Sequence, residues 1–166
     1  VSIMATGGYG RGELSPSSDI DLLFILSQKE TAKQTKFIEF ILYILWDMSL
    51  AIGHATRTVD ENIKAASEDI TIRTALLEIR YIAGDEALAS KMQSSWSKWL
   101  SQQSVSTFIE AKLDERERRV NRTGGTRYAV EPNVKDGKGG LRDLHTLFWV
   151  AKHAYRFTHV LDVMDT

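Results

Sequence analysis

The residues best suited to chemistry are two aspartates, Asp19 and Asp21, at the start of an apolar run. A strand displays residues i and i+2 on one face, so both carboxylates can reach a single metal ion. Ten residues separate Asp19 from the pair Gly7-Gly8, where backbone N–H groups can approach phosphates without a Cβ in the way. This arrangement indicates nucleotidyl transfer, in which metal ions neutralise the charge that builds up around an α-phosphate.

Two neighbours in the same loop, Arg11 and Ser18, could add contacts to a bound nucleotide. Other glycine motifs do not fit. The segment Gly8 to Glu13 lacks the third glycine of a dinucleotide fingerprint, and the segment from Gly7 has Glu13 and Leu14 where a P-loop needs Lys and Ser or Thr. An Asp-x-Asp or a glycine cluster alone is usually a turn, but their order and spacing together favour the functional interpretation.

The elements that must position these residues are short strands and one helix. We predict strands at Val1–Thr6 and Asp19–Leu26, the second apolar enough to be covered on both faces. A loop over Ser15–Ser18 joins them. A core helix over Thr31–Ile52 with Gly53 as its stop, and a third strand over His54–Val59, complete this part.

The remaining chain predicts helices. They cover residues 69–83, 85–100, 105–120 and 141–156, with a loop over 123–140, and the last helix is expected to bury Leu144, Phe148, Ala151 and Tyr155. The sequence therefore predicts an α/β fold: a small mixed-sheet nucleotidyltransferase core in residues 1–62, followed by a helical substrate-side region in residues 63–166.

Composition excludes several other classes. The 166 residues carry a net charge of −1, which indicates no general attraction to nucleic acid. The chain has no cysteine, and none of its four histidines is followed by Asp. The most apolar stretch, Phe37–Ile52, is too short to span a membrane comfortably. We expect a cytoplasmic enzyme, and, because the chain opens with Val1 directly before an apolar run, an N-terminally truncated fragment of a longer multidomain protein.

Two blocks of sequence resemble bacterial PII uridylyltransferases, the bifunctional uridylyltransferase/uridylyl-removing enzymes. The first is the nucleotidyltransferase signature over Gly7–Leu23, GGYGRGELSPSSDIDLL. The second covers Val130–Leu144, VEPNVKDGKGGLRDL, and is similar to the segment that follows the catalytic domain in that family. Between them, residues 45–47, 52–54 and 57–59 also match in order. The first block alone indicates only the polymerase-β-like superfamily; the second makes the resemblance specific.

The resemblance implies transfer of UMP from UTP to a tyrosine of the nitrogen-signalling protein PII, with release of pyrophosphate. It implies that Asp19 and Asp21 hold Mg²⁺ and that Gly7 and Gly8 form the phosphate turn. It also favours substrate or phosphate contacts for three basic residues that flank a glycine stretch: Lys135, Lys138 and Arg142. The uridylyl-removing and glutamine-sensing activities of the family belong to other domains.

Some alternatives stay open. Many members of the superfamily use a third carboxylate, for which Asp60, Glu78 and Glu131 are candidates, and no general base is assigned. The aspartate motif does not select uracil over adenine, so an adenylyltransferase of the same superfamily is a rival. A nucleotide-binding regulatory module without catalysis and a protein-interaction module are the others. No nucleic-acid or membrane partner is expected.

Overall fold

The computed structural model describes residues 1–15, 18–122 and 133–156, and the chain divides into two compact units, Val1–Gln102 and Gln103–Thr166. The division does not coincide with the predicted boundary at residues 62 and 63, because elements beyond residue 62 belong to the first unit. The predicted division into a core and a substrate-side region stays a prediction about function.

The first unit contains a mixed four-stranded sheet in the order β3-β2-β1-β4. Its strands are β1 (Ser2–Thr6), β2 (Ile20–Leu26), β3 (Ile52–Thr58) and β4 (Arg80–Gly84). The central strand β2 pairs antiparallel with β1 and parallel with β3, and β4 pairs antiparallel with the other side of β1. The predicted fold class, an α/β protein with a small mixed sheet followed by helices, is confirmed.

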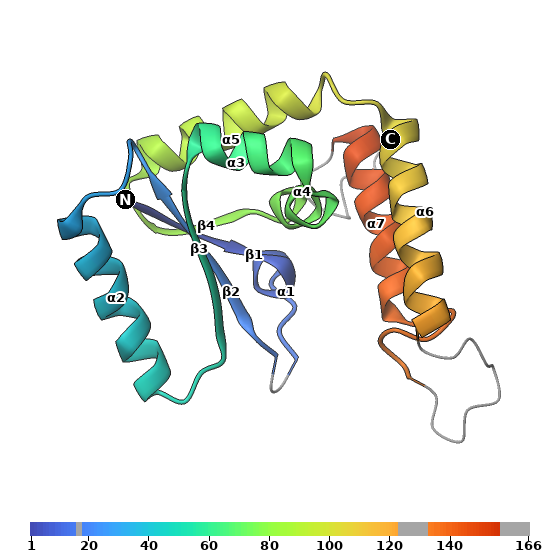
Figure 1. The fold of residues 1–166 in the computed structure, drawn as a ribbon, viewed down its shortest axis with the longest axis horizontal. Coiled ribbons are helices and arrows are strands. Elements are labelled where there is room, and N and C mark those ends of the chain that lie inside the picture. Colours follow the sequence, from blue (N-terminus) through green and yellow to red (C-terminus); the bar gives the residue numbers. More distant parts are fainter. Residues whose placement is uncertain (16–17, 123–132, 157–166) are drawn as a thin grey trace. The chain divides into compact units, whose positions relative to one another are not determined.

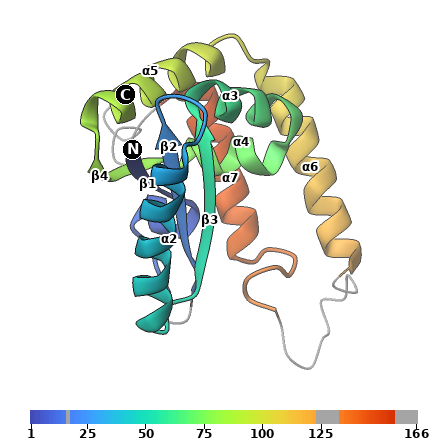
Figure 2. The same cartoon turned by 60° about the vertical axis from the view of Figure 1, so that its left-hand side comes forward.

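Helices cover both faces of the sheet, as the apolar sequence of β2 predicts. On one face, Leu22, Phe24 and Leu26 pack against Ile38 and Leu42 of α2 (Ala32–Asp47). The alternate residues of β2 point to the other face, where Figures 1 and 2 show the helices that follow β3. These are α3 (Val59–Glu68), α4 (Ile70–Leu77) and α5 (Glu86–Leu100).

Helix α2 is shorter than predicted and only one of its sides is buried. It begins at a capping box of Thr31 and Gln34 and ends at Asp47, where Ser49 takes a left-handed conformation with φ of 59°. Ile52 therefore enters β3 instead of ending the helix. The prediction of a core helix is wrong for the outer side. This side and the C-cap residue Met48 expose a set of large apolar side chains: Phe37, Phe40, Tyr43, Ile44, Trp46 and Met48.

The segment predicted as a helix over residues 69–83 contains a helix and a strand. Asp69 caps α4, which ends at Leu77, and residues 80–84 then pair with β1 as the edge strand β4. The apolar spacing of this segment fits a helix, but pairing with the exposed edge of β1 decides its structure. Neither periodicity nor composition reveals such a distant partner.

The second unit contains α6 (Val105–Arg122) and α7 (Leu141–Tyr155), which contact each other. Phe108 and His153 are buried and stack with ring centroids 4.5 Å apart, and Trp149 is buried beside Lys112. The predicted burial of Leu144 and Tyr155 is wrong, since they are 60% and 78% exposed. The side of α7 that packs against α6 carries Trp149 and His153.

None of the described helices is both long and apolar enough to cross a membrane.

Candidate active site

Asp21 lies at the centre of the site, between two glycines. It is paired with Thr6 of β1 on one side and with Gly53 of β3 on the other. A Cβ on Gly7 would stand 2.7 Å from Asp21 Oδ2, and a Cβ on Gly53 would stand 2.5 Å from Asp21 Oδ1. Only glycine leaves room for the carboxylate at both places. The prediction that Gly53 ends a helix is wrong, because Gly53 lies in β3 beside Asp21. Sequence reasoning missed that Gly53 makes room for the carboxylate.

The glycine turn forms a short helix, α1 (Gly7–Arg11), directly after β1. Gly7 has a φ of 57°, a conformation that side chains other than glycine rarely adopt, and this lets the chain turn away from β1 beside Asp21. A Cβ on Gly10 would collide with the backbone oxygen of Glu78. The backbone conformation at Gly7 and the close approach of another backbone segment at Gly10 therefore explain these two glycines.

Two arginines hold α1 against the end of α4 and β4. Arg80 of β4 donates hydrogen bonds to the carbonyl oxygens of Tyr9 and Gly10. Arg11 pairs with the buried carboxylate of Glu78 and with Glu13. A phosphate contact by Arg11, as the sequence predicts, would require part of this guanidinium to turn from the two carboxylates. In the structure Arg11 positions the glycine turn.

The electrostatics of Asp21 favour a bound cation. Burial raises the pKa of the Asp21 carboxyl above its ordinary value of 3.8, and the nearby charge of Asp19 raises it further. The side-chain carboxylate of Asp21 makes no hydrogen bond or ion pair with another described residue. Two carboxylates with unused oxygens suit Mg²⁺, which is commonly held by one or two protein carboxylates together with substrate phosphates. The residues present therefore fit the expected ion.

Among the described residues, no third carboxylate lies beside this pair. No group of three or more His, Cys, Asp or Glu residues suited to a metal occurs in the described part of the chain. Glu78 is engaged by Arg11, and Asp60 lies in the first turn of α3, beyond the end of β3 that is far from Asp21. Glu131 lies outside the described residues.

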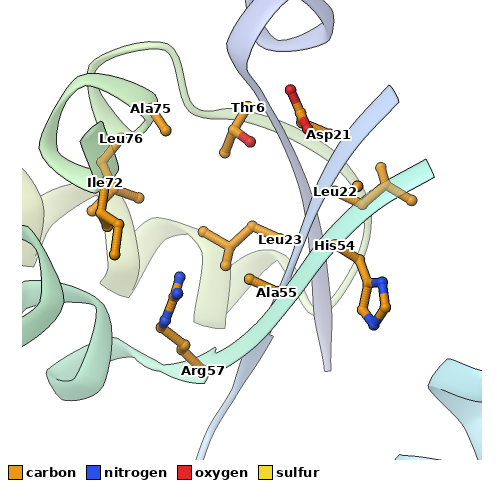
Figure 3. Close-up of a pocket in the computed structure, with 11 residues that line it drawn as sticks. Thr6, Asp21, Leu22, Leu23, His54, Ala55, Arg57, Ile72, Ala75 and Leu76 are labelled. Carbon is orange, nitrogen blue, oxygen red and sulfur yellow. The ribbon is translucent and has the colours of Figure 1, made fainter. Parts of the chain in front are cut away.

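A cavity of about 300 Å³ opens next to Asp21 on the α4 side of the sheet. Figure 3 shows its floor, formed by Leu23 and Ala55, and its wall, formed by Ile72, Ala75 and Leu76 of α4. Asp21 lies at one end and Arg57 of β3 rises into the other, while His54 points to the opposite side of β3. The cavity is mostly apolar with one charged group at each end. Sequence reasoning missed Arg57. Gly53, Ala55 and Arg57 alternate along β3 and therefore lie on one face of the strand, so the position of Arg57 follows once the strand is assigned.

The other predicted site residues differ in placement. Ser18 is exposed just before Asp19, and its backbone N–H donates to the carbonyl oxygen of Ser15. Lys135 and Lys138 are exposed on turns before α7, and Arg142 lies 3.6 Å from Asp136. These three basic residues belong to the second unit, so their contact with a substrate at Asp21 stays a prediction.

Comparison with known proteins agrees with the architecture. Residues 1–78 match the family model of the nucleotidyltransferase domain, and residues 107–166 match the model of GlnD PII-uridylyltransferase. The chain is 58% identical to a bifunctional uridylyltransferase/uridylyl-removing enzyme of Rhodopseudomonas palustris, over 99% of this chain and 18% of the relative. Proteins of the same name from Bradyrhizobium sp. and Rhodospirillum rubrum are 55% and 48% identical, with the same coverage.

The chain thus spans 18% of the length of these relatives, and the match extends over both of its units. The apolar strand that follows Asp19 and contains Asp21, the glycine turn and the two family models all agree with the resemblance that the sequence indicates: over 99% of its length the chain is similar to a segment of bifunctional uridylyltransferase/uridylyl-removing enzymes.

Proposed function

We propose that this chain carries the nucleotidyltransferase site of its family and transfers UMP from UTP to a tyrosine of the PII signalling protein. The observation that carries the proposal is the Asp21 carboxylate, held between Gly7 and Gly53 with Asp19 close enough to raise its pKa. The names of the relatives supply the uridylyl group, and the family resemblance supplies the PII acceptor and its tyrosine. PII and UTP are both expected in the cytoplasm.

In the proposed reaction, the tyrosine oxygen attacks the α-phosphorus of UTP. The bond from that phosphorus to the oxygen bridging the β-phosphate breaks, pyrophosphate leaves, and the phenolic proton is released to water. Asp19 and Asp21 would hold Mg²⁺, which when bound neutralises the negative charge on the phosphates. Gly7 and Gly8 leave space for the β- and γ-phosphates to approach the backbone, and Arg11 and Arg80 keep this turn in place. Ser18, Lys135, Lys138 and Arg142 are proposed as further substrate contacts.

A second candidate function is nucleotide binding without catalysis. It is favoured by one observation: the described residues place no third carboxylate beside Asp19 and Asp21. Release of pyrophosphate separates the two candidates, because a regulatory module would bind UTP with magnesium and leave it intact.

The test is calorimetric titration of UTP, ATP, CTP and GTP, with and without magnesium, into the wild-type chain, Asp19→Asn and Asp21→Asn. We expect magnesium-dependent binding that favours UTP and falls more than about tenfold in both variants, because direct ligands contribute at least as much as residues behind them. Asp47→Asn, at the exposed end of α2, is the matched control and should bind as the wild type does.

A pyrophosphate assay with PII and UTP then tests the transfer itself. A preference for ATP would indicate adenylyl transfer at the same site. Equal binding by the wild type and both aspartate variants would overturn the assignment of the metal ligands.

A further inference from the structure

The cavity beside Asp21 has a shape and lining that the phosphate chemistry does not use. The part of its floor that β3 contributes is made of small residues, because Gly53 and Ala55 lie two residues apart on the same face of that strand. Its opposite wall is Ile72, Ala75 and Leu76, so a flat apolar group can enter between the sheet and α4 (Figure 3). At about 300 Å³ it has the size of a small-molecule site, and such sites usually combine apolar walls with a few polar groups.

The polar group at the end of the cavity opposite Asp21 is Arg57. This residue is half-buried, and its guanidinium makes no hydrogen bond or ion pair with another of the described residues. The charge of Arg57 reaches Glu61 and helps to lower the pKa of that carboxyl, but the main cause is hydrogen bonding with Thr58 at the start of α3. Because Glu61 is already occupied as a cap, the donors of Arg57 remain available in the cavity.

The spacing of the two charged ends fits a nucleotide. Gly53 is the strand partner of Asp21, and Arg57 lies four residues further along β3. Four residues of strand separate the two Cα atoms by about 13 Å, and the long arginine side chain can shorten the distance between the two charged groups. If the α-phosphate lies at Asp21 and the outer phosphates lie at the glycine turn, the nucleoside has to extend the other way. The cavity begins at that point.

We infer that this cavity holds the nucleobase of the substrate and that Arg57 selects a base with a carbonyl acceptor, uracil, by donating a hydrogen bond to it. An arginine has donors only, so it complements the oxygen at position 4 of uracil and not the amino group that cytosine carries there. Adenine also carries an amino group at its corresponding edge. The inference rests on the proposed function, because it assumes a nucleoside triphosphate at Asp21.

The test compares the binding of UTP, CTP and inorganic tripolyphosphate, with magnesium, to the wild-type chain and to Arg57→Met. Methionine keeps an apolar stem and removes the donors. We expect the preference for UTP over CTP to fall about tenfold or more, since a hydrogen bond from a charged group is lost, while tripolyphosphate binding stays unchanged. Arg57→Lys should retain part of the preference.

Two further variants keep the inference falsifiable. Lys29→Met removes a charge that also acts on Glu61 but does not line the cavity, so it should leave the UTP to CTP ratio unchanged. Ala75→Leu fills the cavity from the wall and should weaken UTP while leaving tripolyphosphate unaffected. Circular dichroism confirms that each variant is folded.

The outcomes separate this inference from the proposed function. If wild type binds UTP and tripolyphosphate with magnesium, but Arg57→Met and Ala75→Leu keep the wild-type ratio, the base lies elsewhere and the inference is wrong. If wild type binds neither ligand, the proposed function itself fails, and the base site fails with it.

Discussion

Two aspartates, one in each unit, experience opposite surroundings. Asp143 of α7 accepts two hydrogen bonds of 2.9 Å from Arg116, one of 2.6 Å from Arg119 and one from the backbone of Gly139. The hydrogen bond from Arg116 is the main cause that lowers the pKa of Asp143. Asp21 has no such donors among the described residues, and its pKa is raised by burial and by Asp19.

The difference separates a structural acid from an acid available to a ligand. The chain itself satisfies Asp143, so the folded second unit needs nothing more at that position. The fold places Asp21 between glycines and beside a second negative charge, and none of the described residues forms an ion pair with it. Carboxylates with a raised pKa and no partner for their oxygens are typical of binding and catalytic sites.

The largest effect should come from Asp143→Asn. It removes the negative charge that two arginines share, and we expect the free energy of unfolding of the second unit to fall by about 2 kcal/mol, since partly buried ion pairs with several hydrogen bonds are costly to break. Urea denaturation followed by circular dichroism measures it. Asp136→Asn is the matched control, because its contact with Arg142 is 3.6 Å long and one third exposed, and exposed pairs contribute little. If the free energy of unfolding fell equally in the two variants, Asp143 would stabilise the second unit no more than an exposed carboxylate does.

Gly53→Ala should disturb Asp21 without removing any charge. The new Cβ would stand 2.5 Å from Asp21 Oδ1, so the carboxylate must move. We expect a loss of about tenfold in magnesium-dependent UTP affinity, comparable to the loss of a residue that orients a metal ligand. Calorimetry gives the affinity and thermal unfolding reports whether the sheet is intact.

His54→Ala is the control for this variant. His54 is the next residue of β3, but it points to the opposite face, toward Trp46. It should keep the wild-type affinity. Unchanged binding by Gly53→Ala would mean that Asp21 tolerates a different position, and the glycine would then have no role in the site.

The sequence predicts those parts of the site that are local. Asp19 lies just before the apolar strand β2 and Asp21 is its second residue. Their spacing, together with the glycine pair that precedes them, indicates carboxylates at a strand end. The glycine turn is readable for the same reason, since Gly7 and Gly8 directly follow a buried strand. Coverage of both faces of β2 also follows from its composition, and all five residues from Leu22 to Leu26 are buried.

The parts that depend on distant pairing could not be predicted. Gly53 follows a long apolar run, which is also where a helix would end, and only the parallel register with β2 brings it beside Asp21. β4 has the apolar spacing of a helix and becomes a strand because β1 offers an unpaired edge. In α7, Leu144 is exposed because Trp149 and His153 occupy the interior, which the spacing of apolar residues does not decide.

The smallest effect, and the one most specific to the comparison, is expected from Asp21→Asn without any ligand. At neutral pH the variant removes the cost of a desolvated charge next to Asp19, so the free energy of unfolding of the first unit should rise, by less than about 1 kcal/mol because the carboxylates are partly exposed. Asp143→Asn changes the stability in the opposite direction. Thermal unfolding of both variants and the wild type provides the measurement.

The dependence on pH has opposite sign for the two acids. The pKa of Asp21 is raised in the folded state, so just above pH 3.8 the folded protein keeps a proton on Asp21 that the unfolded chain has lost. The free energy of unfolding therefore falls as pH rises through the raised pKa. The advantage of Asp21→Asn should therefore be present at neutral pH and vanish toward pH 3.8. The folded pKa of Asp143 is lowered, so its contribution is complete above 3.8 and is lost as pH falls further. If Asp21→Asn instead destabilised the unit at neutral pH, Asp21 would be a structural acid like Asp143, and the reason for assigning it to a metal would be gone.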